Sequence, residues 1–248
     1  MDVVTAYLNG ELEEDVYMEI PEQLREVLTK IVAGKHVGSS AEIIRREDVT
    51  RTSRRWLNAL NEHRDSVCLL KKALYGLRQS GLQWYRCLVT KLKQLDMQPT
   101  GQDPCMFTSR RKNCVMLIAI YVDDILIATN DLNWLKEIKQ QLAESFEMKD
   151  LGPVNYCLGI EFQQDENDHS VVLTQRQYIK AILERFNMQD CKSVKTPIDT
   201  NVQLTKPSRA NEKIMKQYPY QCLIGALMYL AVSTRPDIAF AVNFMSQF

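Results

Sequence analysis

The sequence predicts an α+β fold, in which an antiparallel sheet packs against helices, and three observations indicate this class. Hydrophobic residues make up 45% of the 248 residues and charged residues 25%, which is the composition of a globular protein with a buried core. Two apolar runs, residues 114–122 and 125–128, flank an acidic pair in a hairpin pattern. Strand-like and helix-like segments do not alternate as they would in a doubly wound parallel sheet.

The first third of the chain combines strand patterns with helical ones. Residues 3–8 form an apolar segment that is expected to be a buried strand led by Asp2, and residues 16–20 alternate as a strand does. Pro21 then opens a helix whose apolar positions between residues 24 and 32 recur every three or four residues and stop before Gly34. Residues 35–55 are polar without periodicity, so they are expected to form a surface excursion that a short helix at 56–60 closes.

The remaining elements follow from the same two periodicities. Amphipathic helices are expected at residues 82–95, 132–146 and 178–186, and two closing helices near 218–232 and 236–248. Gly152 and Pro153 break the chain, and strands are expected at 156–162 and 171–173. Residues 191–216 have the composition of a linker.

The chain carries 31 basic and 31 acidic residues, but these charges are distributed unevenly. Residues 11–19 contain five acids and no base, whereas residues 71–93 contain six bases and no acid. These six bases are Lys71, Lys72, Arg78, Arg86, Lys91 and Lys93. The basic stretch either forms a surface that binds polyanions or is an ordinary solvated face, and charge alone leaves both interpretations open.

The apolar runs and the cysteines bear on where the protein works. The longest apolar runs are far shorter than the ~20 residues of a membrane-spanning helix, and the N-terminus has no signal-peptide pattern. No membrane partner and no targeting signal are therefore expected. The seven cysteines form no C-x-x-C motif and are expected to be reduced and mostly buried.

The acidic pair Asp123-Asp124 has two interpretations. Aspartate is a favoured turn residue, so the pair could be a solvated hairpin tip. The flanking runs are apolar throughout, however, which is typical of strands buried on both faces. Two adjacent carboxylates held close to the protein body repel one another unless a divalent cation such as Mg²⁺ neutralises them, and Asp2 is the natural third carboxylate of such a site.

Eight segments resemble, in order, the reverse transcriptase of copia-type retrotransposon Pol polyproteins. They cover nearly the whole chain apart from about residues 22–65, and the ordered set is far more specific than any one of them. The segments are residues 1–10 (MDVVTAYLNG), 16–21 (VYMEIP), 70–79 (LKKALYGLRQ) followed by Trp84, 121–124 (YVDD), 158–162 (LGIEF), 195–197 (KTP), 225–230 (GALMYL) and 233–237 (STRPD).

The resemblance implies an RNA-directed DNA polymerase whose palm domain presents three carboxylates to two Mg²⁺ ions, with Mn²⁺ as the alternative metal. It assigns the catalytic and metal-binding roles to Asp2, Asp123 and Asp124, and the backbone carbonyl of Val3 completes the ligands of one metal. It assigns dNTP binding to a further set, namely Tyr7, Gln79 and Lys149. The ring of Tyr7 would exclude a 2′-hydroxyl, although core packing is the alternative role for this side chain.

The resemblance also assigns residues to the nucleic acid and divides the chain into domains. The primer grip is expected at Leu158, Gly159, Ile160, Glu161 and Phe162. Contacts with the nucleic-acid backbone are expected from Lys71, Lys72, Arg78 and Arg86. The implied domains are a palm at 1–165, with an insert at about 22–65, and a thumb with the start of the connection at 166–248.

Family members carry a fingers region before the segment that begins at Met1, so the fingers are expected to be largely missing and the chain to be a truncated part of a polyprotein. The implied partners are an RNA or DNA template-primer, dNTPs and other segments of the same polyprotein, in the cytoplasm within a virus-like particle. One alternative is a catalytically dead remnant that at most binds nucleic acid. Another is a metal-dependent nuclease or phosphatase, which would not explain Tyr7, Gln79 and residues 158–162 together.

Overall fold

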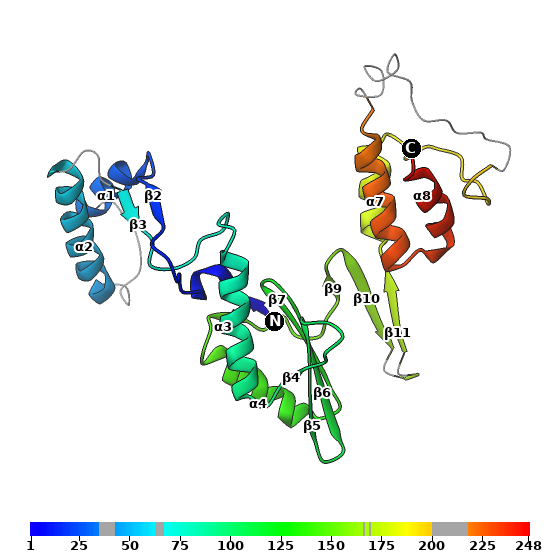
Figure 1. Ribbon diagram of the computed structural model, residues 1–248, viewed down its shortest axis with the longest axis horizontal. Coiled ribbons are helices and arrows are strands. Elements are labelled where there is room, and N and C mark those ends of the chain that lie inside the picture. The colour runs from blue at the N-terminus through cyan, green and yellow to red at the C-terminus, as the bar shows by residue number, and fades with distance from the viewer. Residues whose placement is uncertain (35–42, 63–66, 166, 169, 200–217) are drawn as a thin grey trace. The chain divides into compact units, whose positions relative to one another are not determined.

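A computed structural model describes residues 1–34, 43–62, 67–165, 167–168, 170–199 and 218–248, with the backbone alone for 43–47 (Figure 1). The chain divides into two compact units, Met1–Asp150 and Leu151–Phe248. The boundary between palm and thumb was predicted from the sequence at 165/166. This boundary is a functional division and not the division into compact units, and it stays a prediction. The mixture of helices with antiparallel sheets agrees with the predicted α+β class.

The first unit is built around a six-stranded sheet in which neighbouring strands are antiparallel. In spatial order the strands are β4 (Gln98–Pro99), β5 (Met106–Arg111), β6 (Cys114–Tyr121), β7 (Asp124–Thr129), β1 (Asp2–Val3) and β8 (Met148–Lys149). Helices α3 (Ser80–Gln94) and α4 (Leu132–Ala143) pack against this sheet. The predicted helices at 82–95 and 132–146 and the predicted hairpin are therefore confirmed.

The core of the first unit lies between the two helices and one face of the sheet. The buried side chains of this core include Trp84, Leu88 and Leu92 from α3, Trp134, Ile138 and Leu142 from α4, and Phe107, Met116, Ile118, Ile120 and Ile125 from the sheet. On β6 these residues alternate with exposed Val115, Leu117 and Tyr121. The prediction that the hairpin strands are buried on both faces is therefore wrong, because helices cover only one face.

The first strand and the hairpin turn differ from the prediction. The expected strand at 3–8 pairs only at Asp2–Val3, because the backbone of Thr5 turns into the left-handed region (φ 52°) and the chain continues as the 3-10 helix η1 (Ala6–Asn9). The hairpin turn also lies one residue earlier than expected. Val122 and Asp123 form the turn, whereas Asp124 is the first residue of β7.

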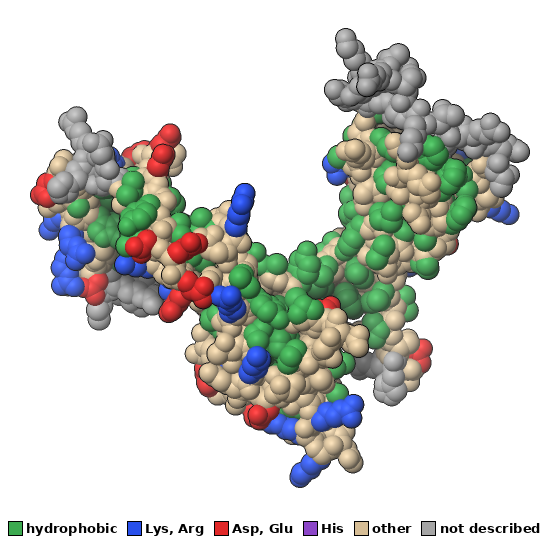
Figure 2. All heavy atoms as spheres, in the orientation of Figure 1, with side chains coloured by type: hydrophobic (Ala, Val, Ile, Leu, Met, Phe, Trp, Pro, Cys, Tyr) green, Lys and Arg blue, Asp and Glu red, His purple; other side chains and the backbone are tan. Residues whose placement is uncertain are grey.

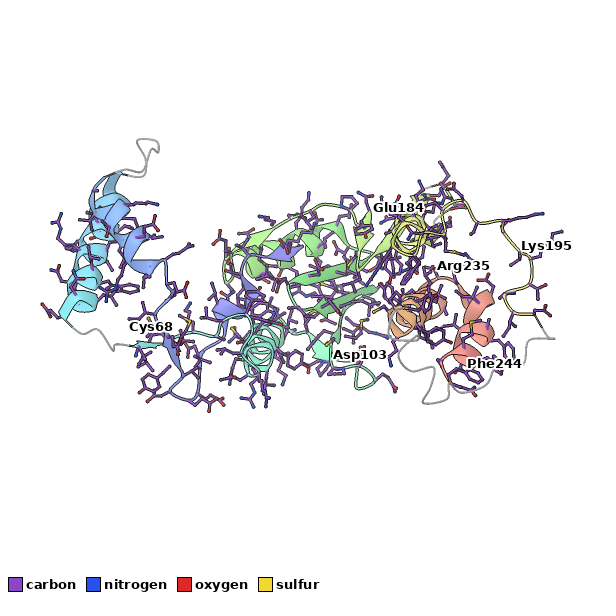
Figure 3. The ribbon with its side chains drawn as sticks, turned by 90° about the horizontal axis from the view of Figure 1, so that it is seen from above. Cys68, Asp103, Glu184, Lys195, Arg235 and Phe244 are labelled. Carbon is purple, nitrogen blue, oxygen red and sulfur yellow. The ribbon has the colours of Figure 1, made fainter. Side chains whose placement is uncertain are left out.

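A small lobe of the first unit contains the predicted insert. β2 (Tyr17–Glu19) pairs with β3 (Val67–Leu69), where Figure 3 labels Cys68, and α1 (Leu24–Val32) packs beside α2 (Ile43–Glu62). The prediction of irregular structure up to residue 55 is wrong where the chain is described, because residues 43–62 form one helix of 20 residues. Its buried positions Ser53 and Leu60 lie on the same side of the helix as the half-exposed Val49 and Trp56. The four positions have helical spacing, which the polar residues between them concealed.

The second unit combines a three-stranded sheet with helices. The sheet contains β9 (Tyr156–Cys157), β10 (Ile160–Asp165) and β11 (Ser170–Thr174), and the helices are α5 (Arg176–Arg185), α7 (Tyr220–Ser233), the 3-10 helix η4 (Pro236–Ile238) and α8 (Ala239–Met245), on which Figure 3 labels Phe244. The predicted strand at 156–162 is divided by a turn at Leu158 and Gly159, which both have positive φ. The predicted linker lies outside the described residues from position 200 onward.

The structure also bears on the predictions about the burial of the cysteines and about membrane-spanning helices. All seven cysteines are free, but only Cys157 is buried, so the prediction of mostly buried thiols is wrong. Among the helices of the described ranges, none has the length and apolar character that crossing a bilayer requires.

Candidate catalytic site

The acidic site is set by strand pairing at the centre of the first sheet. Asp2 is the cross-strand partner of Asp124 on one side and of Lys149 on the other. Asp124 is in turn paired with Tyr121 across the hairpin. Cross-strand partners in antiparallel sheets project from the same face. These four side chains therefore share one face of the sheet.

This face is the one that α3 and α4 leave uncovered. Val3, which follows Asp2, is only 2% exposed and belongs to the core on the opposite face. On β6, Tyr121 lies on the exposed side of the strand, in alternation with the buried Ile120. The fold therefore places Asp2 and Asp124 side by side on an open sheet surface that a large substrate can reach.

Asp123 is held differently, because it belongs to the turn rather than to a strand. Val122 has a left-handed backbone conformation (φ 53°), which is strained for a β-branched residue. Two hydrogen bonds hold this conformation: the Trp84 indole Nε1–H donates to the Val122 carbonyl at 2.7 Å, and the Val3 amide donates to the Asp123 carbonyl at 2.8 Å. The turn is therefore anchored both to α3 and to β1.

The carboxylate of Asp123 is only partly satisfied. Its Oδ2 accepts a hydrogen bond from the Tyr75 hydroxyl at 2.9 Å, whereas its Oδ1 is buried and has no hydrogen-bond partner among the described residues. A buried acceptor without a partner costs about 1–3 kcal/mol. Partial burial of the phenol and the adjacent Asp123 carboxylate raise the pKa of Tyr75, so the phenol remains a donor at neutral pH.

The two aromatic rings beside this carboxylate support each other. The ring of Tyr7, on η1, lies 4.3 Å from the ring of Tyr75 between centroids, with an interplanar angle of 31°. A Cβ added at Gly81 would lie 3.7 Å from the Tyr7 hydroxyl, so the start of α3 borders this ring as well. Tyr7 is half-buried and packs against the core of the first unit, while the rest of its ring remains accessible to a ligand.

These acids fit a divalent metal that arrives with its substrate. Among the described residues, no three His, Cys, Asp or Glu side chains converge on one point as a preformed metal site. Mg²⁺ is commonly held by one or two carboxylates together with water and substrate phosphates, so a complete protein cage is not required. The cross-strand carboxylates of Asp2 and Asp124 and the unpartnered oxygen of Asp123 are hard oxygen donors of the kind that Mg²⁺ prefers.

The basic stretch and the acidic stretch of the sequence lie next to each other. Arg86 forms an ion pair with Glu13 at 2.8 Å, the Gln79 amide donates to Glu14 at 2.9 Å, and Lys72 forms an isolated β-bridge with Glu11. Lys71 and Arg78 are exposed. Among the residues predicted to contact the nucleic-acid backbone, Arg86 is therefore engaged in an ion pair. This ion pair is exposed and weak enough for a phosphate to replace Glu13.

The predicted primer-grip residues form the turn between β9 and β10 in the second unit. The Leu158 carbonyl accepts a hydrogen bond from the Tyr229 hydroxyl on α7, and a Cβ added at Gly159 would lie 3.6 Å from the same ring. The Glu161 carboxylate accepts a hydrogen bond at 2.8 Å from the backbone N–H of Gln177, at the start of α5. Ile160 and Phe162 lie on β10. Both α5 and α7 thus fix the shape of this turn.

Three residues with clear contacts had no predicted role: Tyr75 and Trp84 beside the acids of the first unit, and Tyr229 beside the β9–β10 turn of the second unit. All three lie in the segments that carry the family resemblance, at 70–79, after 79 and at 225–230. Their position in these segments was the one feature of the sequence that could have indicated a role. Their hydrogen bonds to Asp123, Val122 and Leu158 join residues far apart in sequence, so only the fold identifies them.

Comparison with known proteins supports one family. Residues 57–200 match the family described as reverse transcriptase (RNA-dependent DNA polymerase). The chain is 37% identical over its whole length to a retrovirus-related Pol polyprotein from transposon TNT 1-94 of Nicotiana tabacum, covering 16% of that protein. It is 38% identical over 184 residues to the Pol polyprotein from transposon RE2 of Arabidopsis thaliana, covering 74% of this chain and 12% of that protein.

A third relative is shorter. The putative transposon Ty5-1 protein YCL074W of Saccharomyces cerevisiae is 27% identical over 249 residues, covering all of this chain and 68% of that protein. No solved structure matches the chain. The chain spans only 12–16% of the length of the plant polyproteins it matches. From the family match over residues 57–200 and the similarity to transposon Pol polyproteins, the chain belongs to the reverse transcriptase (RNA-dependent DNA polymerase) family of copia-type elements.

Proposed function

We propose that this chain carries the polymerising site of a copia-type reverse transcriptase and extends a primer with dNTPs on an RNA or DNA template. The observation that carries the proposal is the cross-strand pairing of Asp2 with Asp124 on the open sheet face, beside the partly unsatisfied carboxylate of Asp123. In this assignment residues 1–165 are the palm and residues 166–248 are the thumb with the start of the connection.

The metals and the acids have separate tasks in this proposal. Two Mg²⁺ ions, or Mn²⁺ in their place, would activate the primer 3′-hydroxyl and stabilise the leaving pyrophosphate when bound. The carboxylates of Asp2, Asp123 and Asp124, with the Val3 carbonyl, would hold these ions. Because the Asp123 turn is anchored by Trp84 and Val3, these ligands need little reorganisation when substrate binds.

The other side chains of the site act on the substrates. Lys149 is the cross-strand neighbour of Asp2, and its cation would contact the triphosphate. Tyr7 would contact the sugar and Gln79 the base pair, while Lys71, Lys72, Arg78 and Arg86 would contact backbone phosphates without reading sequence. The turn from Leu158 to Phe162 would seat the primer end. By analogy with the relatives' names, we extend the proposal to work within a Pol polyprotein. The family resemblance of the sequence segments further implies that this work takes place in a virus-like particle in the cytoplasm.

The test is primer extension on an RNA template with a DNA primer. We expect dNTP incorporation that requires Mg²⁺, and we expect Asp124→Asn to lower the rate by at least about 100-fold, because one carboxylate of the site is lost. Asp103→Asn is the matched control. Asp103 is an acid before β5 whose Oδ1 accepts a hydrogen bond from the Cys105 amide, and an asparagine can keep that bond.

Two outcomes would contradict the proposal. Near-normal extension by Asp124→Asn would show that this carboxylate does not hold a catalytic metal. Retained template-primer binding without any extension by the unmodified chain would instead favour a catalytically dead remnant. A nuclease would be recognised in the same reactions by shortening of the primer.

A further inference from the structure

Tyr75 lies at the corner of a tight turn just before α3. The Leu77 amide donates to the Leu74 carbonyl at 3.3 Å, so Tyr75 and Gly76 are the two central residues of a β-turn. Gly76 has a φ of 100°, the positive value that the third position of a type II turn requires and that glycine adopts without strain. The run Leu-Tyr-Gly-Leu therefore places the tyrosine at the corner of this turn.

Two further hydrogen bonds fix the turn in the first unit. Ser80, which is fully buried in the first turn of α3, donates its hydroxyl to the Leu74 carbonyl at 2.5 Å. Ala73, which is also fully buried, donates its amide to the carbonyl of Gly10, the residue after η1, at 3.0 Å. Because one bond ties the turn to α3 and the other ties it to the end of η1, the backbone of Tyr75 has a defined place beside both elements.

From this place the Tyr75 hydroxyl reaches one oxygen of Asp123. It donates to Oδ2 at 2.9 Å across 48 positions of sequence, whereas Oδ1 is buried without a hydrogen-bond partner in the part of the chain that the structure describes. A buried oxygen without a partner is unfavourable, so a carboxylate free to rotate would turn that oxygen toward water. The bond from Tyr75 therefore holds Asp123 in an orientation that the carboxylate alone would not keep.

The ring of Tyr75 lies against the ring of Tyr7, with 4.3 Å between the centroids. Tyr75 is nevertheless 52% exposed, and Figure 2 shows hydrophobic side chains, a class that includes tyrosine there, gathered on the surface where α3 meets β7. One aromatic contact and one hydrogen bond thus orient this side chain, and replacing tyrosine by phenylalanine removes only the second. The phenol lies between the Tyr7 ring and the Asp123 carboxylate.

We propose that Tyr75 is a positioning residue of the polymerising site, whose hydroxyl fixes the Asp123 carboxylate as a metal ligand while its ring is steadied by Tyr7. A group that donates a hydrogen bond to a metal ligand orients that ligand, and its loss typically costs about 10- to 100-fold in metal affinity. The proposal rests on the proposed function in taking Asp123 as a metal ligand. Tyr75 plays no part in the strand pairing of Asp2 with Asp124, so its effect is confined to one ligand.

The first test measures metal binding without catalysis. The full chain is titrated with Mn²⁺ alone, without dNTPs or nucleic acid, and free Mn²⁺ is followed by electron paramagnetic resonance. Tyr75→Phe should weaken Mn²⁺ binding by about 10-fold, because the ring remains but the hydroxyl that orients Asp123 is lost. Tyr85→Phe is the matched control. It removes a hydroxyl that donates to the Pro104 carbonyl, outside the acidic site, and should leave Mn²⁺ binding unchanged.

A double-mutant cycle shows whether the hydroxyl acts through Asp123. In the Asp123→Asn background the carboxylate that Tyr75 orients is gone, so adding Tyr75→Phe should change the Mn²⁺ affinity by less than about 2-fold. A general loss of packing would instead weaken Mn²⁺ binding equally in both backgrounds.

The second test separates metal binding from nucleotide binding in primer extension. Tyr75→Phe should raise the Mg²⁺ concentration for half-maximal rate by about 10-fold, in line with the loss of metal affinity. At saturating Mg²⁺ the kcat and the KM for dNTP should return to the values of the unmodified chain, because the defect lies in holding the metal. Structural damage to the site would not be repaired by added metal.

Three results would overturn the proposal. Equal Mn²⁺ affinity in Tyr75→Phe and Tyr85→Phe would show that the phenol does not orient the ligand, and tighter binding by Tyr75→Phe would show that it competes with the metal for Asp123. Absence of Mn²⁺ binding by the unmodified chain would show that there is no ligand to orient. Failure of the polymerase proposal is distinguishable from these results, because a chain that extends no primer can still show the loss of Mn²⁺ affinity in Tyr75→Phe and its disappearance in the Asp123→Asn background.

Discussion

Aromatic side chains around Asp123 decide how its carboxylate is presented. Tyr75 donates to one carboxylate oxygen, Trp84 donates to the preceding carbonyl, and the ring of Tyr7 lies tilted against that of Tyr75. The hydrogen bond from Trp84 to the Val122 carbonyl stabilises the strained left-handed backbone of Val122. The acid pair is therefore presented by a network that includes β1, η1 and α3.

Tyr7 is expected to act as a filter against ribonucleotides. Tyr7→Ala should reduce discrimination against rNTPs by about 10- to 100-fold, because the clash that a ring imposes on a 2′-hydroxyl is removed. The measurement is the ratio of kcat/KM for a dNTP and the matching rNTP in primer extension. Tyr7→Phe is the control and should keep the discrimination, since it keeps the ring. An equal loss for both sugars in Tyr7→Ala would show that Tyr7 only packs.

Tyr75 provides a pH-dependent test of its contact with Asp123. Burial, the hydrogen bond to Asp123 and the charge of Asp123 raise the pKa of this phenol above its ordinary value of 10.0. Because the folded protein keeps the proton more strongly, the stabilisation is present below pH 10 and is lost as the pH rises through the folded pKa. Asp123→Asn should lower the pKa of Tyr75 toward, but not to, the ordinary value, because burial remains.

The measurement is an NMR titration of the Tyr75 ring in the unmodified chain and in Asp123→Asn, with the Tyr85 ring as internal reference. Partial burial raises the pKa of Tyr85 as well, and the nearby Cys105 and Asp103 add to this rise. Asp123 does not contribute, so the pKa of Tyr85 should be the same in both proteins. An unchanged pKa of Tyr75 in Asp123→Asn would contradict the hydrogen bond.

At the scale of elements, the approach of η1 to α3 depends on a glycine. A Cβ added at Gly10 would lie 2.9 Å from the Gln83 Cβ and 3.0 Å from the Trp84 amide nitrogen, and backbone atoms cannot yield as a side chain would. Gly10→Ala should therefore destabilise the fold by about 1–3 kcal/mol through overpacking. The measurement is chemical unfolding followed by circular dichroism.

Gly81→Ala is the matched control for this overpacking. A Cβ there would meet only the Tyr7 hydroxyl, at an ordinary contact distance of 3.7 Å. Since Gly81 lies in the first turn of α3, where alanine favours the helix, stability should stay within about 1 kcal/mol of the unmodified chain or rise. Equal losses in the two variants would show that η1 does not approach α3 this closely.

Helices and strands whose apolar residues recur at a regular spacing were predictable from the sequence. Elements whose bounds are set by tertiary contacts were not. Helices α3, α4 and α5 carry apolar stripes that their sequences display, and the β6–β7 hairpin is marked by its apolar runs. By contrast, β1 stops after Val3 because Thr5 takes a left-handed conformation, which no pattern in an apolar run indicates. Helix α2 was missed because Ser53 occupies one of its few inward positions.

The acids of the site were predicted from their apolar flanking runs and from the family segments, whereas the residues that surround these acids were not predicted. Asp2 and Asp124 are separated by most of the first unit, so their pairing needs β1 to lie beside β7. Periodicity says nothing about strand order. The donor role of Tyr75 likewise depends on the loop before α3 reaching the hairpin turn.

At the scale of the whole molecule, the two compact units differ in the size of their cores. The core of the first unit contains two tryptophans and a phenylalanine that are almost fully buried, Trp84, Trp134 and Phe107. The core cluster of the second unit has Ile182, Ala226 and Leu230 as its buried members. Burial of apolar surface stabilises by about 25 cal/mol per Å², so the unit that buries large rings is expected to be the more stable.

Hydrogen exchange on the full chain should therefore resolve two levels of protection. Amides of β6 and of α3 around Leu88 should exchange slowest, at a rate set by global opening of the first unit. Amides in the middle of α5 and α7 should exchange faster although they are equally hydrogen-bonded, because opening the smaller core costs less free energy. Phe107→Ala is the discriminating variant. It should accelerate exchange in β6 and α3 while leaving α5 and α7 unchanged, since the cavity it creates lies within one unit. If α5 and α7 accelerate to the same extent as β6, the two units unfold as one cooperative body and the independence of their cores is refuted.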